Sequence, residues 1–110
     1  MQAAASGVAP TDIDAVLAEH SVPVLVDCFT PGCGPCAALG AVLDEVAGDL
    51  QGQLAIQKID VAAHPEVAKR FGLRGVPALL LFKDGQLKAS RVGAASRTQL
   101  LTWLSIHGSV

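Results

Sequence analysis

A short apolar run at residues 22–29 constrains the fold of this chain more than any other feature. The run is rich in β-branched residues, and Asp27 is its single charged member. A strand with apolar residues on both faces is typical of the centre of a parallel sheet that helices cover on both sides. We therefore expect residues 22–29 to form a buried central strand.

Helical patterns are found on both sides of this strand. Thr11 and the acidic residues after it predict the N-cap and first turn of a helix that runs to about His20. After the turn-rich residues 30–35, apolar residues recur every three or four positions. This spacing predicts a second helix that begins at the cysteine pair, Cys33 and Cys36.

Two further helices and a strand are predicted after this pair. Residues 54–61 have the composition of a strand. Pro65 is favourable at the first position of a short helix, which Gly72 would end. Near the end of the chain, Ser96 and Gln99 form the pattern of a capping box, and the leucines that follow supply a buried stripe for a last helix.

A hairpin is predicted between these two helices. Residues 78–82 and 87–92 form its strands, because Asp84-Gly85 accepts the positive φ angles of a tight turn. The order strand, helix, strand, helix, hairpin, helix predicts an α/β fold whose mixed sheet starts parallel and ends antiparallel. In such sheets, sites form at the carboxyl ends of the strands, where the cysteine pair lies.

We expect one domain over residues 1–110, with residues 1–10 either flexible or forming a short first strand. Eight Lys and Arg face ten Asp and Glu, a net charge of −2 without a basic run, so nucleic-acid binding is not expected. The longest apolar run, residues 76–82, is too short to cross a bilayer, so no membrane association is expected. Because residues 1–10 lack the features of a secretory signal, we expect a cytoplasmic protein.

The Cys33-Gly34-Pro35-Cys36 segment supplies the chemistry. Two sulfurs about one helical turn apart can join as a disulfide or separate as thiols without refolding. Amide N–H groups and the helix dipole favour a thiolate on Cys33, which would lower its pKa below the ordinary value of about 8.5. Cys33 would attack a substrate disulfide, and Cys36 would resolve the mixed disulfide. Pro35 holds the first turn, and Gly34 leaves room for a partner chain.

Two other interpretations of the cysteine pair stay open on the residues alone. A zinc site would need two further ligands, and only Cys28 and scattered histidines remain. A purely structural disulfide is disfavoured in a reducing compartment. We therefore expect no metal, and no cofactor beyond the redox-active disulfide of Cys33 and Cys36.

The chain resembles the thioredoxin family over residues 23–104. The resemblance rests on the Cys-Gly-Pro-Cys segment, the order of the predicted elements and several separated motifs. These motifs are Val24-Leu25-Val26-Asp27, Lys58-Ile59-Asp60-Val61, Gly75-Val76-Pro77, Phe82-Lys83-Asp84-Gly85 and Val92-Gly93-Ala94. The resemblance implies the thioredoxin fold, a central mixed sheet of four to five strands flanked by helices on both faces. It also implies a monomeric protein-disulfide reductase that passes electrons from a thioredoxin reductase or a similar donor to oxidised proteins.

The resemblance further implies a substrate-binding surface. Pro77 would be a cis-proline lying against the cysteines, and the backbone of Val76 would pair with an extended substrate segment. On the residues alone, an ordinary trans proline at the start of a strand is equally open. The other residues assigned to this surface are Gly32, Gly34, Pro35, Gly75 and Gly93.

Asp27 and Lys58 are the remaining candidates for the site. Burial would raise the pKa of the Asp27 carboxyl, which would make it a proton acceptor for Cys36. The family pattern places Lys58 near this acid, where it would temper the rise. The alternative is a polar pair that serves structure only. Cys28 would point to the opposite face of the strand, as a buried apolar residue rather than a third redox thiol.

The chain departs from the family pattern beside the first cysteine. Gly32 stands where thioredoxins usually have Trp, and Ala37 and Ala41 replace a basic residue and a proline. We expect a more exposed Cys33 and altered docking of partners. One alternative function is therefore a redox-tuned protein-binding module with little general reductase activity. A disulfide-forming oxidase is a third hypothesis, which the Gly-Pro dipeptide and the missing secretory signal disfavour.

Overall fold

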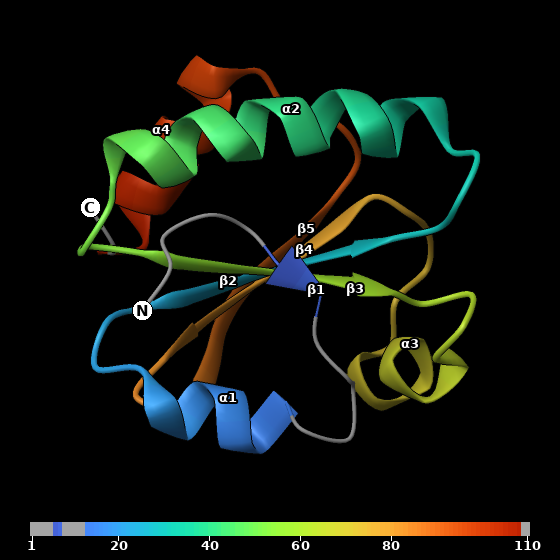
Figure 1. The fold of residues 1–110 in the computed structure, drawn as a ribbon, viewed down its shortest axis with the longest axis horizontal. Coiled ribbons are helices and arrows are strands. Elements are labelled where there is room, and N and C mark those ends of the chain that lie inside the picture. The colour runs from blue at the N-terminus through green and yellow to red at the C-terminus, as the bar shows by residue number, and fades with distance from the viewer. Residues whose placement is uncertain (1–5, 8–12, 109–110) are drawn as a thin grey trace.

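The computed structural model describes residues 6–7 and 13–108 of the chain. These residues form helices and strands in the alternating order that the sequence predicts (Figure 1). The elements are β1 (Ser6–Gly7), α1 (Ile13–Glu19), β2 (Val24–Phe29), α2 (Gly34–Asp49), β3 (Ala55–Asp60), α3 (Pro65–Phe71), β4 (Ala78–Lys83), β5 (Gln86–Val92) and α4 (Arg97–Ile106).

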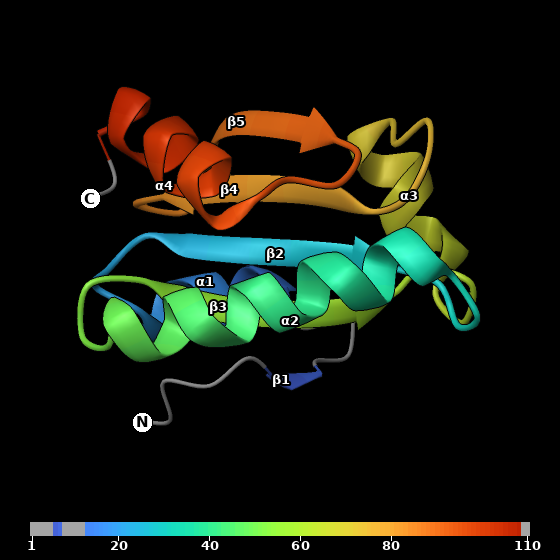
Figure 2. The same cartoon turned by 90° about the horizontal axis from the view of Figure 1, so that it is seen from above.

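The strands form one mixed sheet in the order β1-β3-β2-β4-β5. Strands β1, β3 and β2 run parallel, whereas β4 is antiparallel to β2 and β5 is antiparallel to β4. Figure 1 shows α2 and α4 on one face of the sheet and α1 and α3 on the other, and Figure 2 shows the strands side by side in this order. The predicted α/β fold, with a sheet that starts parallel and ends antiparallel, is confirmed.

The central strand β2 is buried along nearly its whole length, as its apolar sequence predicts. Its residues alternate between two cores because successive side chains in a strand point to opposite faces. Val26 packs in the core beneath α1 and α3, and Leu25 packs in the core beneath α2 and α4. The strand starts at Val24 rather than at residue 22, and the imide nitrogen of Pro23 has no hydrogen to give to a ladder.

Local signals in the sequence set the end of α3, the turn between β4 and β5 and the start of α4. Gly72 ends α3 in the left-handed conformation, with φ 63°. Asp84 and Gly85, with φ 53° and 76°, join β4 to β5. Ser96 and Gln99 form the capping box at the start of α4, so each of these three predictions is confirmed.

The predictions for the first residues are tested only in part. Ser6–Gly7 pairs in parallel with β3 as a two-residue strand, which fits the predicted short first strand. Thr11, the predicted N-cap of the first helix, lies outside the described residues, and α1 is described from Ile13. Within the described residues, no helix combines the length and the apolar character needed to span a membrane.

Candidate active site: the disulfide at the start of α2

The two cysteines of the Cys-x-x-Cys segment form a disulfide where β2 leads into α2. Their Cα atoms lie 5.2 Å apart. Cys33 is the N-cap of α2, and its sulfur accepts a hydrogen bond of 3.1 Å from the backbone N–H of Cys36. The carbonyl of Cys33 accepts a second bond, of 3.1 Å, from the N–H of Ala37. The sulfur therefore lies where an N-cap oxygen usually lies, next to the positive end of the helix.

The two sulfurs differ in their access to solvent. Cys36 is buried, with 5% of its surface exposed, whereas Cys33 is partly exposed. Gly32 precedes Cys33 with φ 76°, and a Cβ built on it would meet no atom within 4 Å. The open space beside Cys33 agrees with the absence of a bulky residue at position 32.

The residues predicted to bind substrate lie at the same edge of the sheet as the disulfide. Cys28 near the end of β2 pairs with Ala78 at the start of β4, and Ala78 pairs with Val92 at the end of β5. Pro77 and Gly93 directly flank this row, and the N–H of Gly93 donates a 2.8 Å hydrogen bond to the Pro77 carbonyl.

The peptide bond between Val76 and Pro77 is cis, which is the geometry that the resemblance implies. Pro77 is buried, Val76 is partly buried and Gly75 is exposed. Gly34 and Pro35 form the exposed first turn of α2.

A cavity of about 490 Å³ opens beside the disulfide. It brings together Gly32, Cys33, Cys36, Asp27 and Lys58 from the predicted site, but none of the residues around the cis-proline lines it. The remaining wall comes from Phe29, Thr30, Pro31, Ala37, Gly40, Ala41 and Asp44. The cavity and the cis-proline thus contribute two separate regions around the disulfide.

Asp27 is buried on the face of β2 that α2 covers, with 2% of its surface exposed. Its Oδ1 atom has no hydrogen-bond partner among the described residues. Burial raises the pKa of the Asp27 carboxyl from 3.8 to about 6; Lys58 lowers it, and Asp44 adds to the rise. The expected direction of the shift is confirmed.

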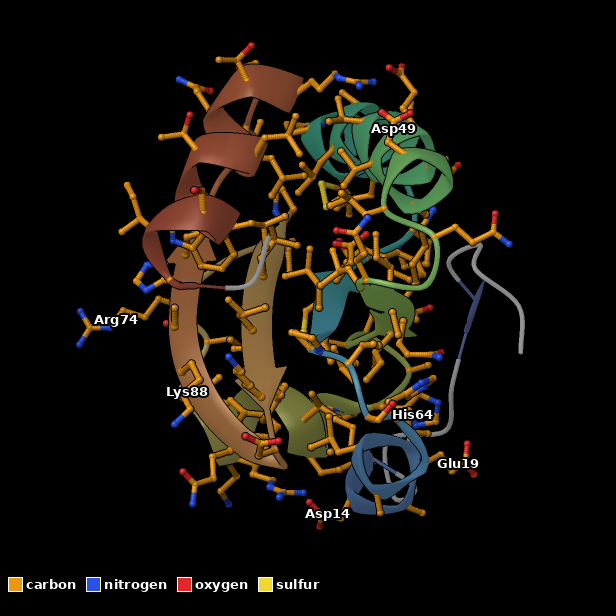
Figure 3. The ribbon with its side chains drawn as sticks, turned by 90° about the vertical axis from the view of Figure 1, so that its left-hand side faces the viewer. Asp14, Glu19, Asp49, His64, Arg74 and Lys88 are labelled. Atoms are coloured by element: carbon orange, nitrogen blue, oxygen red, sulfur yellow. A yellow bond between two sulfur atoms is a disulfide. The ribbon has the colours of Figure 1, made fainter. Side chains whose placement is uncertain are left out.

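Asp27 differs in its burial from most of the described acidic residues, whose side chains are exposed. The labelled side chains of Asp14 and Glu19 lie at the periphery in Figure 3, where both residues are exposed. Of these three carboxyls, that of Asp27 is the one shielded from solvent.

Lys58 lies beside Asp27, because the two residues are partners in the parallel pairing of β2 and β3. Its ammonium, however, donates a hydrogen bond of 3.2 Å to Oδ1 of Asp44 on α2. Asp44 is not among the residues predicted from the sequence. The signal was its spacing, since Cys36, Gly40 and Asp44 follow one another at intervals of four residues along one side of the helix.

Cys28 is the one cysteine outside the disulfide, and it is fully buried in the core beneath α1 and α3. Burial, with a smaller contribution from the charge of Asp27, raises the pKa of its thiol to about 12. A thiol in this state is neither a good nucleophile nor a good metal ligand. Over the described part of the chain, no group of three or more His, Cys, Asp or Glu side chains is placed to hold a metal ion.

Comparisons with known proteins agree with this geometry. The thioredoxin family model matches residues 6–106. A thioredoxin of Pseudomonas aeruginosa is 46% identical over 85 residues, which is 77% of this chain and 79% of the relative. A thioredoxin of Haemophilus influenzae is 38% identical over 96 residues, which is 87% of this chain and 90% of the relative. Thioredoxin 1 of Synechococcus elongatus is 42% identical over 89 residues, which is 81% of this chain and 83% of the relative.

Proposed function

The chain belongs to the thioredoxin family and is a thiol-disulfide oxidoreductase, and we propose that Cys33 is its attacking thiolate and Cys36 its resolving thiol. Members of the family react through these cysteines directly, so the sulfurs themselves carry the electrons. The observation that supports the assignment of Cys33 is the hydrogen bond from the Cys36 N–H to its sulfur. A donor at this position stabilises negative charge on Cys33.

The proposed reaction transfers two electrons from the dithiol to a substrate disulfide. The Cys33 thiolate attacks one substrate sulfur, which forms a mixed disulfide and releases the other substrate sulfur as a thiolate. Cys36 then loses its proton and attacks the Cys33 sulfur. This second step restores the Cys33–Cys36 disulfide and releases the remaining substrate thiol. The partly exposed Cys33 and the buried Cys36 suit these two roles.

We assign the acceptance of the Cys36 proton to Asp27. Both residues line the cavity beside the disulfide. Because burial raises the pKa of Asp27 to about 6, the carboxylate predominates at neutral pH and is still basic enough to take up a proton during the reaction. Lys58 is the residue that tunes this acid, since its charge opposes the effect of burial.

The proposed substrate-binding surface is made of an exposed part on α2 and a less exposed part around the cis-proline. Gly32, Gly34 and Pro35 border the disulfide on the side of α2, and all three are exposed. Gly75, Val76, Pro77 and Gly93 border it at the ends of β4 and β5. An extended segment of an oxidised protein would lie along the backbone of Val76, which brings its disulfide to Cys33.

Thioredoxins generally work with a thioredoxin reductase and with disulfide substrates. For this chain we propose oxidised proteins as substrates and a thioredoxin reductase or a similar donor as the source of electrons. We further propose that it acts as a monomer of one domain, residues 1–110, in the cytoplasm. A reducing compartment suits a protein whose third cysteine, Cys28, is an unpaired thiol.

The proposal is tested by following the reduction of insulin with dithiothreitol. The wild-type protein is expected to accelerate the reaction, and Cys33→Ser to abolish the acceleration. A rate unchanged by Cys33→Ser would show that the nucleophile is assigned wrongly. The same assay driven by NADPH, with and without a thioredoxin reductase, tests the proposed electron donor.

A further inference from the structure

We propose that Asp44 is a positioning residue for disulfide exchange, which holds the Lys58 ammonium at the wall of the cavity so that the Asp27 carboxyl remains free to take the proton of Cys36. The proposal rests on the proposed role of Asp27 as proton acceptor. It adds a residue on α2 that would act on the reaction through Lys58.

The first observation is that the Lys58 ammonium pairs with Asp44 and not with Asp27. Lys58 and Asp27 are paired residues on adjacent parallel strands, and both line the same cavity. Strands in a sheet lie about 4.8 Å apart, so the Lys58 side chain starts close to Asp27. Its ammonium nevertheless lies 3.2 Å from Oδ1 of Asp44, and among the described residues no ion pair joins it to Asp27.

The second observation is the space that α2 provides for the ammonium. Gly40 is buried and lies one helical turn before Asp44. A Cβ built on Gly40 would lie 3.5 Å from Nζ of Lys58, which is van der Waals contact. The ammonium therefore lies beside this turn of α2 with room for a Cβ between them, and within reach of the Asp44 carboxylate.

The third observation concerns the other groups that face Asp27. From α2 these are Cys36 and Asp44, and from β3 the group is Lys58. The residue opposite Asp27 on β4 is Leu79, which carries no charge.

Helix α4 covers the same face of the sheet and carries Arg97. The Arg97 guanidinium is bound to Glu45 and to Asp49, which Figure 3 labels on α2. Arg91 of β5 lies in the same cross-strand row as Asp27, beyond Leu79, and its guanidinium lies over the Trp103 ring of α4. Lys58 is therefore the cation whose position decides how much positive charge reaches Asp27.

Moving the Lys58 ammonium toward Asp27 would strongly lower the pKa of the Asp27 carboxyl. An opposite charge within about 4–6 Å lowers the pKa of a carboxyl by about 1–3 units. The Lys58–Asp44 pair itself is partly solvent-exposed, with 26% and 62% of the two side chains accessible. Pairs with this exposure contribute little to stability, so the consequence of this one lies in where it keeps the charge.

The experiment is a double-mutant cycle on the oxidised protein, in which Cys33 and Cys36 do not titrate. The titration of the Asp27 carboxyl carbon is followed by NMR in wild type, Asp44→Asn, Lys58→Met and the double variant. In the presence of Lys58, Asp44→Asn is expected to lower the midpoint by about one unit, because the ammonium is released toward Asp27. In the Lys58→Met background, Asp44→Asn is expected to lower the midpoint much less. Only the direct effect of the Asp44 charge on Asp27 is then lost.

Comparing the shift in the Lys58 and Lys58→Met backgrounds shows whether Asp44 acts on Asp27 through Lys58. A shift on Asp44→Asn that is no larger with lysine at position 58 than with Lys58→Met overturns the proposal. Glu45→Gln is the matched control, because it removes one charge from the next residue of α2, which pairs with Arg97 instead. It is expected to leave the titration of Asp27 unchanged.

Failure of this proposal and failure of the proposed function are distinguishable. The NMR cycle measures the coupling of three side chains and does not depend on turnover. The role of Asp27 as acceptor is tested separately by the rate at which Cys36 resolves a mixed disulfide, which Asp27→Asn should slow. If Asp27 does accept the proton, Asp44→Asn should also move the acid limb of that rate profile to lower pH.

Discussion

Asp27 and Cys28 are adjacent on β2, yet their side chains lie on opposite faces of the sheet. Asp27 lines the cavity beside the disulfide, whereas Cys28 is enclosed in the core beneath α1 and α3. Burial raises the pKa of both groups, to about 6 and about 12. For Asp27 a pKa near neutrality fits its proposed role as proton acceptor, and for Cys28 the raised pKa keeps the thiol protonated. The alternation of one strand therefore places the proposed acceptor beside the disulfide and the unpaired thiol in the opposite core.

The first prediction concerns the cost of burying Asp27. Since burial raises its pKa from 3.8 to about 6, the folded protein binds this proton more tightly than the unfolded chain. Between those two values the folded state holds more protons, so the stability of the wild-type protein falls as the pH rises. The Asp27→Asn side chain does not titrate. The free energy of unfolding of this variant, relative to that of the wild type, should therefore rise by about 3 kcal/mol between low and neutral pH. Urea unfolding across this range measures the difference, and a constant difference between the two proteins would contradict the prediction.

The second prediction is that Cys28→Ala retains reductase activity. Cys28 is fully buried and belongs to neither region around the disulfide, so its thiol should contribute only to packing. We expect unchanged insulin reduction and a loss of about 1 kcal/mol in the free energy of unfolding. In the reduced wild-type protein, iodoacetamide should modify Cys28 only after unfolding. Loss of activity in a folded Cys28→Ala variant would indicate a redox role.

The third prediction compares two exposed glycines that flank Cys33. Gly32 has φ 76°, which an L-residue adopts with strain, whereas Gly34 is the first residue of α2. Gly32→Ala should destabilise the oxidised protein by about 1 kcal/mol, and Gly34→Ala should be neutral or mildly stabilising because alanine favours the helix. Thermal unfolding of the two variants tests this. Equal effects would mean that the backbone at Gly32 does not require glycine.

The fourth prediction concerns the cap of α4. The Ser96 hydroxyl accepts a hydrogen bond of 3.1 Å from the backbone N–H of Gln99, and Oε1 of Gln99 accepts a bond of 2.9 Å from the backbone N–H of Ser96. Ser96→Ala should cost about 1 kcal/mol of stability. Thr98→Ala, in the same turn, is the control and should cost nothing. Far-UV circular dichroism during urea unfolding reports both values, and equal stabilities for the two variants would refute the role of the cap.

The features predicted correctly from the sequence depend on residues close together in the chain. The hairpin at Asp84-Gly85, the cap at Ser96 and the helix that starts at Cys33 each follow from a few neighbouring residues. The burial of Asp27 was also predictable, because a charged residue in an otherwise apolar run has no exposed face to occupy.

The features that the sequence did not reveal depend on how distant elements pack. The pairing of Lys58 with Asp44 requires α2 to lie over β3 in one register, which the pattern of either element alone does not determine. The cavity is likewise formed by separate elements, since Asp27 of β2 and Lys58 of β3 line it together with small residues of α2 such as Ala37 and Ala41. The spacing within α2 places the two alanines on one side of the helix, but it does not show which strands lie opposite them.

The central claim, that Cys33 attacks and Cys36 resolves, is tested most directly by trapping the mixed disulfide. The reduced Cys36→Ser variant is mixed with insulin, and the adduct is digested and identified by mass spectrometry. The account predicts a stable adduct on Cys33 with Cys36→Ser and little or none with Cys33→Ser. An adduct that forms equally well on Cys36 in the Cys33→Ser variant, or no adduct with Cys36→Ser, would contradict it.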